Sequence, residues 1–315
     1  MAAGNHMGRS GVIRPYLKGE RNMKKGLSLL LALLCLLSIP LSASAEEIQS
    51  RAVIGADLDN AQVDAVYGMF GVPRGSVIEL KVTNAEERQW LEGYVDESLI
   101  GTRSISCVFV ELLPAGSGMS VTTSNITWCT GEMYISALAT AGITDARITV
   151  AAPFEVSGTA ALTGIYKAYE DMTGKKLDDL AKLVSTQELT ITGDLAQEIG
   201  SMDSTSIVNE LKLMLNETKN MTDAELRSQI EQIASRYNVK LTETQIKQLI
   251  DLCRSLEGLN AEQLKQRVEE IQGTLRKVSD AKTKVVGFAK TVKKVVDSVS
   301  GFFARISDIL DHFKR

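Results

Sequence analysis

Between residues 46 and 172 the hydrophobic positions alternate between helical and strand-like spacing. Residues 57–70 carry apolar side chains at helical spacing, whereas residues 76–83 alternate apolar and polar side chains as a half-buried strand does. The same criteria predict further helices over 85–94, 131–141 and 157–171, and further strands over 102–113, 119–128 and 146–152. We therefore predict an α+β head domain over residues 46–172, built on a mixed, mostly antiparallel sheet with helices.

Local signals predict how some of these elements begin and connect. Residues 114–118 (Pro-Ala-Gly-Ser-Gly) predict a hairpin loop between strands 102–113 and 119–128, because glycine supplies the positive φ values of such turns. Asn84 and Ser157 are predicted N-caps of the helices that follow them.

Residues 173–258 have a helical pattern throughout and predict an all-α domain. Two capping boxes, Thr222-Asp-Ala-Glu225 and Thr242-Glu-Thr-Gln245, open amphipathic helices over 223–237 and 243–257.

Apolar residues recur every seven positions from residue 259 to the end, with Lys282 as a polar break in the seam. This pattern predicts one long basic helix over 259–315, with a length on the order of 80 Å. Two interpretations remain open: a coiled coil, formed between chains or folded back on the helical domain, and an amphipathic helix on an anionic surface. The residues expected at a membrane or partner contact are Lys277, Lys282, Lys284, Lys290, Lys293, Lys294, Val292, Val299, Phe302 and Phe303.

The N-terminal region has the order of a secretory signal peptide. Residues 23–45 contain a short basic stretch, an apolar run too short to span a membrane comfortably, and the cleavage sequence Ala43-Ser-Ala45. Cys35 lies inside the apolar run without the small residue that precedes a lipoprotein cysteine. We expect residues 1–22 to be an over-extended start or a cloning remnant, and the protein to be extracellular or associated with the cell envelope.

Charge is distributed unevenly once residues 1–45 are set aside. The remaining chain has 29 basic and 38 acidic residues, a net charge of −9. Residues 260–315 have 12 basic and 7 acidic residues (+5), so residues 46–259 carry −14. This asymmetry predicts that the tail contacts an anionic membrane or cell-wall polymer, or the acidic body itself, and we expect no nucleic-acid partner.

Few residues of this chain suit metal binding or histidine-dependent catalysis. After residue 45 the chain has a single histidine, His312, which weakens mechanisms that need a positioned imidazole. Cys107, Cys129 and Cys253 are widely spaced, so we expect buried free thiols, with a Cys107–Cys129 disulfide as the alternative. We predict no metal and no cofactor.

Arg103, Ser157 and Thr159 are the candidate ligand-binding residues of the head. Arg103 lies among small polar residues, where it could bind a carboxylate ligand or, as we favour, form an ion pair with an acidic neighbour. Ser157 and Thr159 flank Gly158 at a predicted helix start, where free N–H groups favour anions, although Glu155 would repel a phosphate. Trp90 and Trp128 lie in amphipathic elements and are interpreted as core anchors.

Five segments of the head resemble the YpuA-like family of secreted proteins of Gram-positive bacteria. They are Val53-Ile-Gly-Ala-Asp57, Val82-Thr-Asn-Ala-Glu-Glu-Arg88, Ile100-Gly-Thr-Arg-Ser-Ile-Ser-Cys107, Asn125-Ile-Thr-Trp128 and Val150-Ala-Ala-Pro-Phe-Glu-Val-Ser-Gly-Thr-Ala-Ala-Leu-Thr-Gly-Ile165. The resemblance implies an exported protein of unknown function and supplies no catalytic residues.

The sequence thus leaves two hypotheses about function. The first is a non-enzymatic envelope or extracellular binding protein that uses a helical stalk. The second is a secreted enzyme with a histidine-independent small-molecule site in the head.

Overall fold

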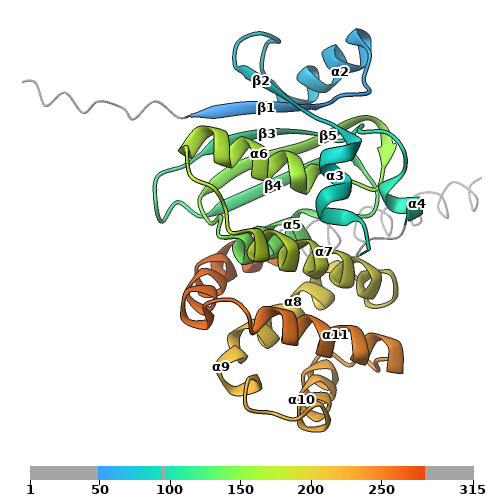
Figure 1. Ribbon diagram of the computed structural model, residues 1–315, viewed down its shortest axis with the longest axis vertical. Coiled ribbons are helices and arrows are strands. Elements are labelled where there is room, and N and C mark those ends of the chain that lie inside the picture. Colours follow the sequence, from blue (N-terminus) through green and yellow to red (C-terminus); the bar gives the residue numbers. More distant parts are fainter. Residues whose placement is uncertain (1–48, 94–96, 281–315) are drawn as a thin grey trace, which may run out of the picture. The chain divides into compact units, whose positions relative to one another are not determined.

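The computed structural model describes residues 49–93 and 97–280. Its labelled helices and strands (Figure 1) are β1 (Ser50–Gly55), α2 (Asn60–Phe70), β2 (Ile78–Val82), α3 (Asn84–Leu91), α4 (Glu97–Ile100), β3 (Cys107–Leu112), β4 (Met119–Ile126), α5 (Gly131–Ala141), β5 (Ala146–Val156), α6 (Ala161–Thr173), α7 (Asp179–Ile199), α8 (Ser201–Leu213), α9 (Leu215–Thr218), α10 (Asp223–Arg236) and α11 (Glu243–Leu256).

The five strands form one mixed sheet in the order β2-β1-β3-β5-β4. The predicted α+β fold with a mixed sheet and a helical C-terminal region is therefore confirmed. Antiparallel pairing is found in β1/β3 and β3/β5, whereas β1/β2 and β4/β5 are parallel, so antiparallel pairs make up half of the sheet rather than most of it.

The predicted hairpin between β3 and β4 is wrong, because β5 lies between these two strands. β5 is antiparallel to β3, with Cys107 opposite Ala151, and parallel to β4. The connecting loop instead crosses the start of β5, where the carboxylate and the backbone carbonyl of Asp145 each accept a hydrogen bond from it. The N–H of Gly118 donates to Asp145 Oδ1 (2.8 Å) and the N–H of Leu113 donates to the Asp145 carbonyl (3.1 Å).

Alternate residues of the strands face two different hydrophobic layers. Ala52 and Ile54 of β1 point to the face covered by α2, whereas Val53 between them belongs to the core formed with α5 and α6. Helices therefore cover both faces of the sheet (Figure 1).

Two predicted N-caps are shifted along the chain. Thr83 caps α3 in place of Asn84, because the Thr83 hydroxyl and the Glu86 carboxylate form a capping box. Helix α6 begins at Ala161, so Ser157 is not its cap. The two capping boxes predicted for α10 and α11 are confirmed.

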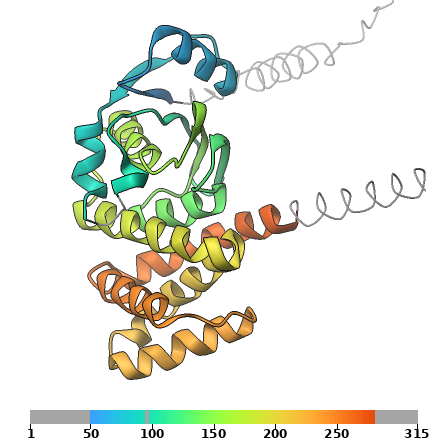
Figure 2. The same cartoon turned by 90° about the vertical axis from the view of Figure 1, so that its right-hand side faces the viewer.

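Helices α7 to α11 lie on the side of α5 that faces away from the sheet (Figure 2). A buried ion pair joins α5, α7 and α8 there: Lys212 Nζ lies 2.9 Å from Glu188 Oε1, and both side chains are almost completely inaccessible. Ser136 and Thr140 of α5 donate hydrogen bonds to the Glu188 carboxylate (2.6 and 2.5 Å), so its oxygens have several partners.

The first part of the heptad pattern packs within its own chain. Residues 261–280 are helical, and their side chains Leu264 and Val268 belong to the core of the helical region, while Ile271 belongs to the core beneath the sheet. Lys277 is exposed; the other residues predicted for membrane or partner contact, from Lys282 to Phe303, lie outside the described residues. Within the described ranges, no helix combines the length and apolar character needed to cross a membrane.

Candidate functional site

A cavity of about 670 Å³ opens at the C-terminal end of β5. Four separate stretches of chain line it: the segment before β3, the two residues after β4, the end of β5 with the turn that follows, and α7. Arg103, Ser157 and Thr159, which were predicted from the sequence as ligand-binding residues, all line this cavity. The full described lining is Ser98, Ile100, Gly101, Thr102, Arg103, Ile105, Ser106, Thr127, Trp128, Phe154, Glu155, Val156, Ser157, Thr159, Ala160 and Gln197.

Hydrogen bonds from Tyr134 of α5 and from Cys129 fix the turn that carries Ser157 and Thr159. Tyr134 of α5 donates its hydroxyl to the Gly158 carbonyl (2.5 Å), and the N–H of Cys129 donates to the Ser157 carbonyl (3.0 Å). Gly158 has φ = 95°, and a Cβ added there would lie 2.4 Å from Ile126 Cγ2, so glycine is required at this position. The turn therefore presents its two hydroxyl groups from a rigid backbone.

Arg103 and Glu155 bring opposite charges to this cavity without pairing. Arg103 Nη2 donates to the Asp57 carbonyl oxygen (2.9 Å), not to a carboxylate, so the predicted alternative of an ion pair with an acidic neighbour is wrong within the described residues. Glu155 is exposed on β5 and has no hydrogen bond or ion pair with any described residue.

Aromatic and hydroxyl groups complete the cavity wall. Trp128 packs partly on the core, but it also lines the cavity, and Phe154 is 44% exposed. The Trp128 ring lies directly on α7, where a Cβ added at Gly193 would be 2.2 Å from its Cζ2 atom. Ser106 also lines the cavity and is only 4% exposed. This wall was not predicted from the sequence. The one indication of it was a glycine inside helix α7, Gly193, which leaves room for the Trp128 ring.

Helix α3 holds the segment that carries Arg103. Arg88 donates to the Gly101 carbonyl (3.0 Å), and Ser104 donates its hydroxyl to the Glu87 carboxylate. Burial raises the pKa of Glu87 to about 7, because desolvation outweighs the hydrogen bonds from Ser104 and Asn84. The burial of Glu87 could not be predicted from the sequence, because it depends on the distant Ser104.

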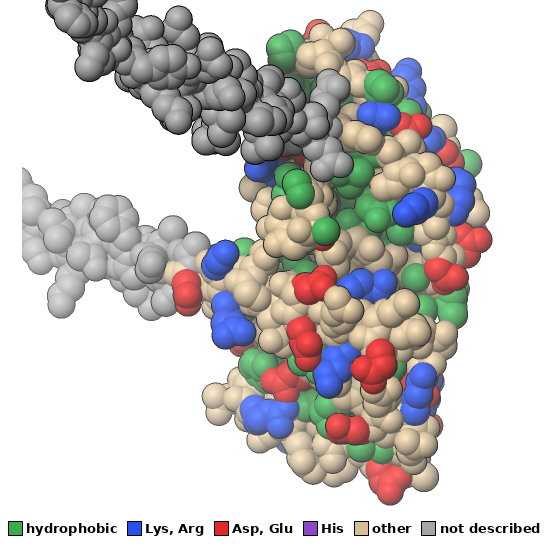
Figure 3. Space-filling model, turned by 90° about the vertical axis from the view of Figure 1, so that its left-hand side faces the viewer, with side chains coloured by type: hydrophobic (Ala, Val, Ile, Leu, Met, Phe, Trp, Pro, Cys, Tyr) green, Lys and Arg blue, Asp and Glu red, His purple; other side chains and the backbone are tan. Residues whose placement is uncertain are grey.

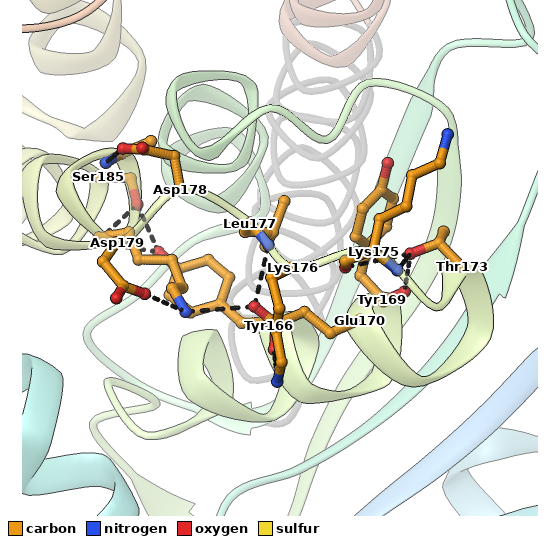
Figure 4. Close-up of polar contacts among 12 residues, drawn as sticks. Tyr166, Tyr169, Glu170, Thr173, Lys175, Lys176, Leu177, Asp178, Asp179 and Ser185 are labelled. Atoms are coloured by element: carbon orange, nitrogen blue, oxygen red, sulfur yellow. Dashed lines mark hydrogen bonds and ion pairs between the residues drawn. The ribbon is translucent and has the colours of Figure 1, made fainter.

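A second cavity of similar volume lies between α3, α6 and α7, and its charged groups other than Asp178 are paired with one another. Figure 4 shows Glu170 accepting hydrogen bonds from the Leu177 N–H (3.0 Å) and from Lys176 (2.7 Å). Lys182 contacts Glu170 (3.2 Å) and Asp179 (2.8 Å), and lies 4.3 Å from the centre of the Trp90 ring. These charges have partners within the protein, in contrast to Arg103 and Glu155.

The described side chains offer little to a metal or to thiol chemistry. Among them, no group of three or more His, Cys, Asp or Glu residues is placed to hold a metal ion. Cys107, Cys129 and Cys253 are free and buried, as predicted, and burial raises the pKa of each thiol to about 12. The thiols are therefore protonated at neutral pH and unreactive.

The fold and the cavity define an α+β protein with helices on both faces of a mixed sheet and a ligand-sized cavity beside its α7–α11 region. The chain belongs to the family described as Protein of unknown function (DUF1002), which matches residues 54–274. It is 34% identical over 290 residues to the Uncharacterized protein YpuA of Bacillus subtilis (strain 168), in an alignment that covers 90% of this chain and 97% of that protein. No solved structure gives a significant match. The resemblance to the YpuA-like family is thus confirmed.

Proposed function

We propose that the protein is an exported, non-enzymatic binding protein of the cell envelope or extracellular space, and that it holds a small polar ligand in the head cavity. The observation that carries this proposal is the convergence of Arg103, Ser157 and Thr159 from two distant segments on one cavity of about 670 Å³. Small-molecule sites commonly have volumes of roughly 300–1,000 Å³ and combine apolar walls with a few polar groups. Trp128 and Phe154 supply such a wall.

The cavity supports binding better than catalysis. General acid–base catalysis needs groups with tuned pKa values within reach of the reacting atoms. Glu87 has such a pKa, but it is fully buried, hydrogen-bonds to Ser104 and does not line the cavity. Glu155 is the one carboxylate in the described lining, so a secreted enzyme with a histidine-independent mechanism would have to depend on it.

A ligand panel tests the proposal. Thermal unfolding of the mature chain is followed with single amino acids, dipeptides, hexoses, N-acetylated sugars and inorganic phosphate. At least one compound class should raise the Tm of the wild-type protein but not that of Arg103→Gln or Phe154→Ala. Arg147→Gln is the matched control, because Arg147 lies on β5 away from the cavity and pairs with Glu111 (3.1 Å). A panel without any stabilising compound, or equal stabilisation of all variants, would refute ligand binding in this cavity. Chemical conversion of a bound compound that Glu155→Gln abolishes would instead support the enzyme.

We propose in addition that residues 281–315 contact an anionic surface. These residues include 8 basic and 3 acidic side chains, whereas residues 260–280 have 4 of each. On the face seen in Figure 3, Lys and Arg side chains of the described part lie among Asp and Glu side chains.

The packing of the 261–280 helix determines which deletion is informative. Removing residues from 260 onward would also remove the buried side chains of Leu264, Val268 and Ile271 and unfold the core. Deleting residues 281–315 alone should abolish salt-sensitive sedimentation with phosphatidylglycerol vesicles and leave the Tm nearly unchanged. Equal vesicle binding by the full and shortened chains would exclude this role. Fractionation of the native culture, with the intact mass of the mature N-terminus, tests export and cleavage after Ala45.

A further inference from the structure

We infer that the ligand of the head cavity is zwitterionic: an amino acid or short peptide with a free ammonium group and a free carboxylate. This inference rests on the proposed function. Arg103 and Glu155 are the only charged side chains in the described lining, they have opposite sign, and neither has an ion-pair partner among described residues. A zwitterion would give both of them a partner at once.

The carboxylate fits the Arg103 end of the cavity. Arg103 uses Nη2 for the Asp57 carbonyl (2.9 Å), so its other N–H groups can donate to a carboxylate, for which guanidinium geometry is well suited. Ala160, the N-cap residue of the 13-residue helix α6, borders the same cavity, and the N-terminal end of a helix favours negative charge.

The ammonium group fits Glu155, and the apolar part of the ligand fits the aromatic wall. Phe154, beside Glu155 in the chain, and Trp128 offer ring surface to a hydrocarbon side chain. Ser157 and Thr159 follow Glu155 in the chain, and their hydroxyl groups lie 3.4 Å from each other.

Other ligand classes fit these groups less well. A phosphate would be repelled by Glu155, and a neutral sugar would offer hydroxyl groups but no opposite charge to either side chain. In the cavity beside Trp90, Lys182 already pairs with Glu170 and Asp179, so it does not require a charged group from a ligand.

Isothermal titration calorimetry with alanyl-phenylalanine tests the inference. The free dipeptide is compared with its N-acetyl form, which has no ammonium group, and with its C-terminal amide, which has no carboxylate. For the wild-type protein each blocked form should bind at least tenfold more weakly, equivalent to about 1.4 kcal/mol. Glu155→Gln should lose the discrimination against the N-acetyl form alone, and Arg103→Gln the discrimination against the amide alone. The matched controls Glu111→Gln and Arg147→Gln should keep both.

Each contrary result is decisive. Failure of the free dipeptide to bind, or equal binding of the free and blocked forms, overturns the inference. So does a uniform loss of affinity in the variants without a change in discrimination. If another compound of the panel binds in an Arg103-dependent way while peptides do not, the zwitterion inference fails and the proposed function stands. If nothing binds, both fail.

Discussion

Glu87 of α3 is fully buried, and its carboxylate accepts a hydrogen bond from Ser104. Its pKa is raised from the ordinary value of 4.5 to about 7, chiefly by desolvation, with smaller contributions from the charges of Asp57 and Glu86. Replacing Glu87 with glutamine removes this charge but keeps an oxygen that can accept from Ser104. The substitution therefore isolates the cost of ionising a buried carboxyl group.

The sign and size of the effect follow from linkage. Since the folded-state pKa is the higher one, the contribution of Glu87 to stability is fully present below about pH 4.5 and is lost as the pH rises through about 7. One pKa unit corresponds to about 1.4 kcal/mol, so the loss approaches ~3 kcal/mol at pH 8. Glu87→Gln should be close to the wild type in stability at pH 4.5 and more stable by up to about that amount at pH 8.

Urea unfolding at several pH values between 4.5 and 8 measures this difference. Glu86→Gln is the matched control on the same helix. Burial acts to raise the pKa of Glu86, but hydrogen bonds from Lys167 and Thr83 outweigh it and lower the pKa. Its stabilising contribution is therefore present at high pH and lost as the pH falls, so Glu86→Gln should be less stable than the wild type at pH 8. A stability difference for Glu87→Gln that does not grow between pH 4.5 and pH 8 would refute the reasoning.

Three further substitutions test other parts of the structure. Lys212→Met leaves the buried Glu188 carboxylate without its cation and should lower the free energy of unfolding by about 3–5 kcal/mol in urea titrations. Adding Glu188→Leu to this variant should restore part of the lost stability. Strictly additive effects of the two substitutions would contradict the pairing. In Gly193→Ala the new Cβ would lie 2.2 Å from the Trp128 ring. The substitution should therefore displace the ring, change its fluorescence emission and lower the affinity for any ligand of the head cavity. Unchanged emission and affinity would show that the ring is not held there. Thr222→Ala removes the N-cap of α10 and should cost about 1 kcal/mol, a prediction that fails if the urea midpoint does not move.

Elements determined by local interactions could be predicted from the sequence. The capping boxes at Thr222 and Thr242 satisfy backbone donors within four residues, so spacing alone identified them. Thr83-Asn-Ala-Glu86 carries the same signal, and with it the start of α3 could have been predicted correctly. The position of β5 between β3 and β4 could not, because strand order depends on contacts between residues far apart in the chain.

In the candidate site, too, local features could be predicted from the sequence and long-range contacts could not. Arg103, Ser157 and Thr159 were recognisable as polar groups in small-residue segments, but their convergence depends on the packing of β5, α6 and α7. The pKa of Glu87 depends on burial against Ser104, 17 positions away. The first heptads showed a seam, but the sequence left open whether its partner was another chain; Leu264, Val268 and Ile271 pack within this one.

The fluorescence of the two tryptophans tests most directly whether the head cavity is the ligand site. Trp90→Phe leaves Trp128, which lines the head cavity, as the sole reporter, and Trp128→Phe leaves Trp90, which lines the cavity with paired charges. Titration with alanyl-phenylalanine and the rest of the panel should give a saturable emission change in the protein that retains Trp128, and none in the protein that retains Trp90. A saturable change reported by Trp90 alone, or by neither tryptophan, would contradict the assignment of the head cavity as the binding site.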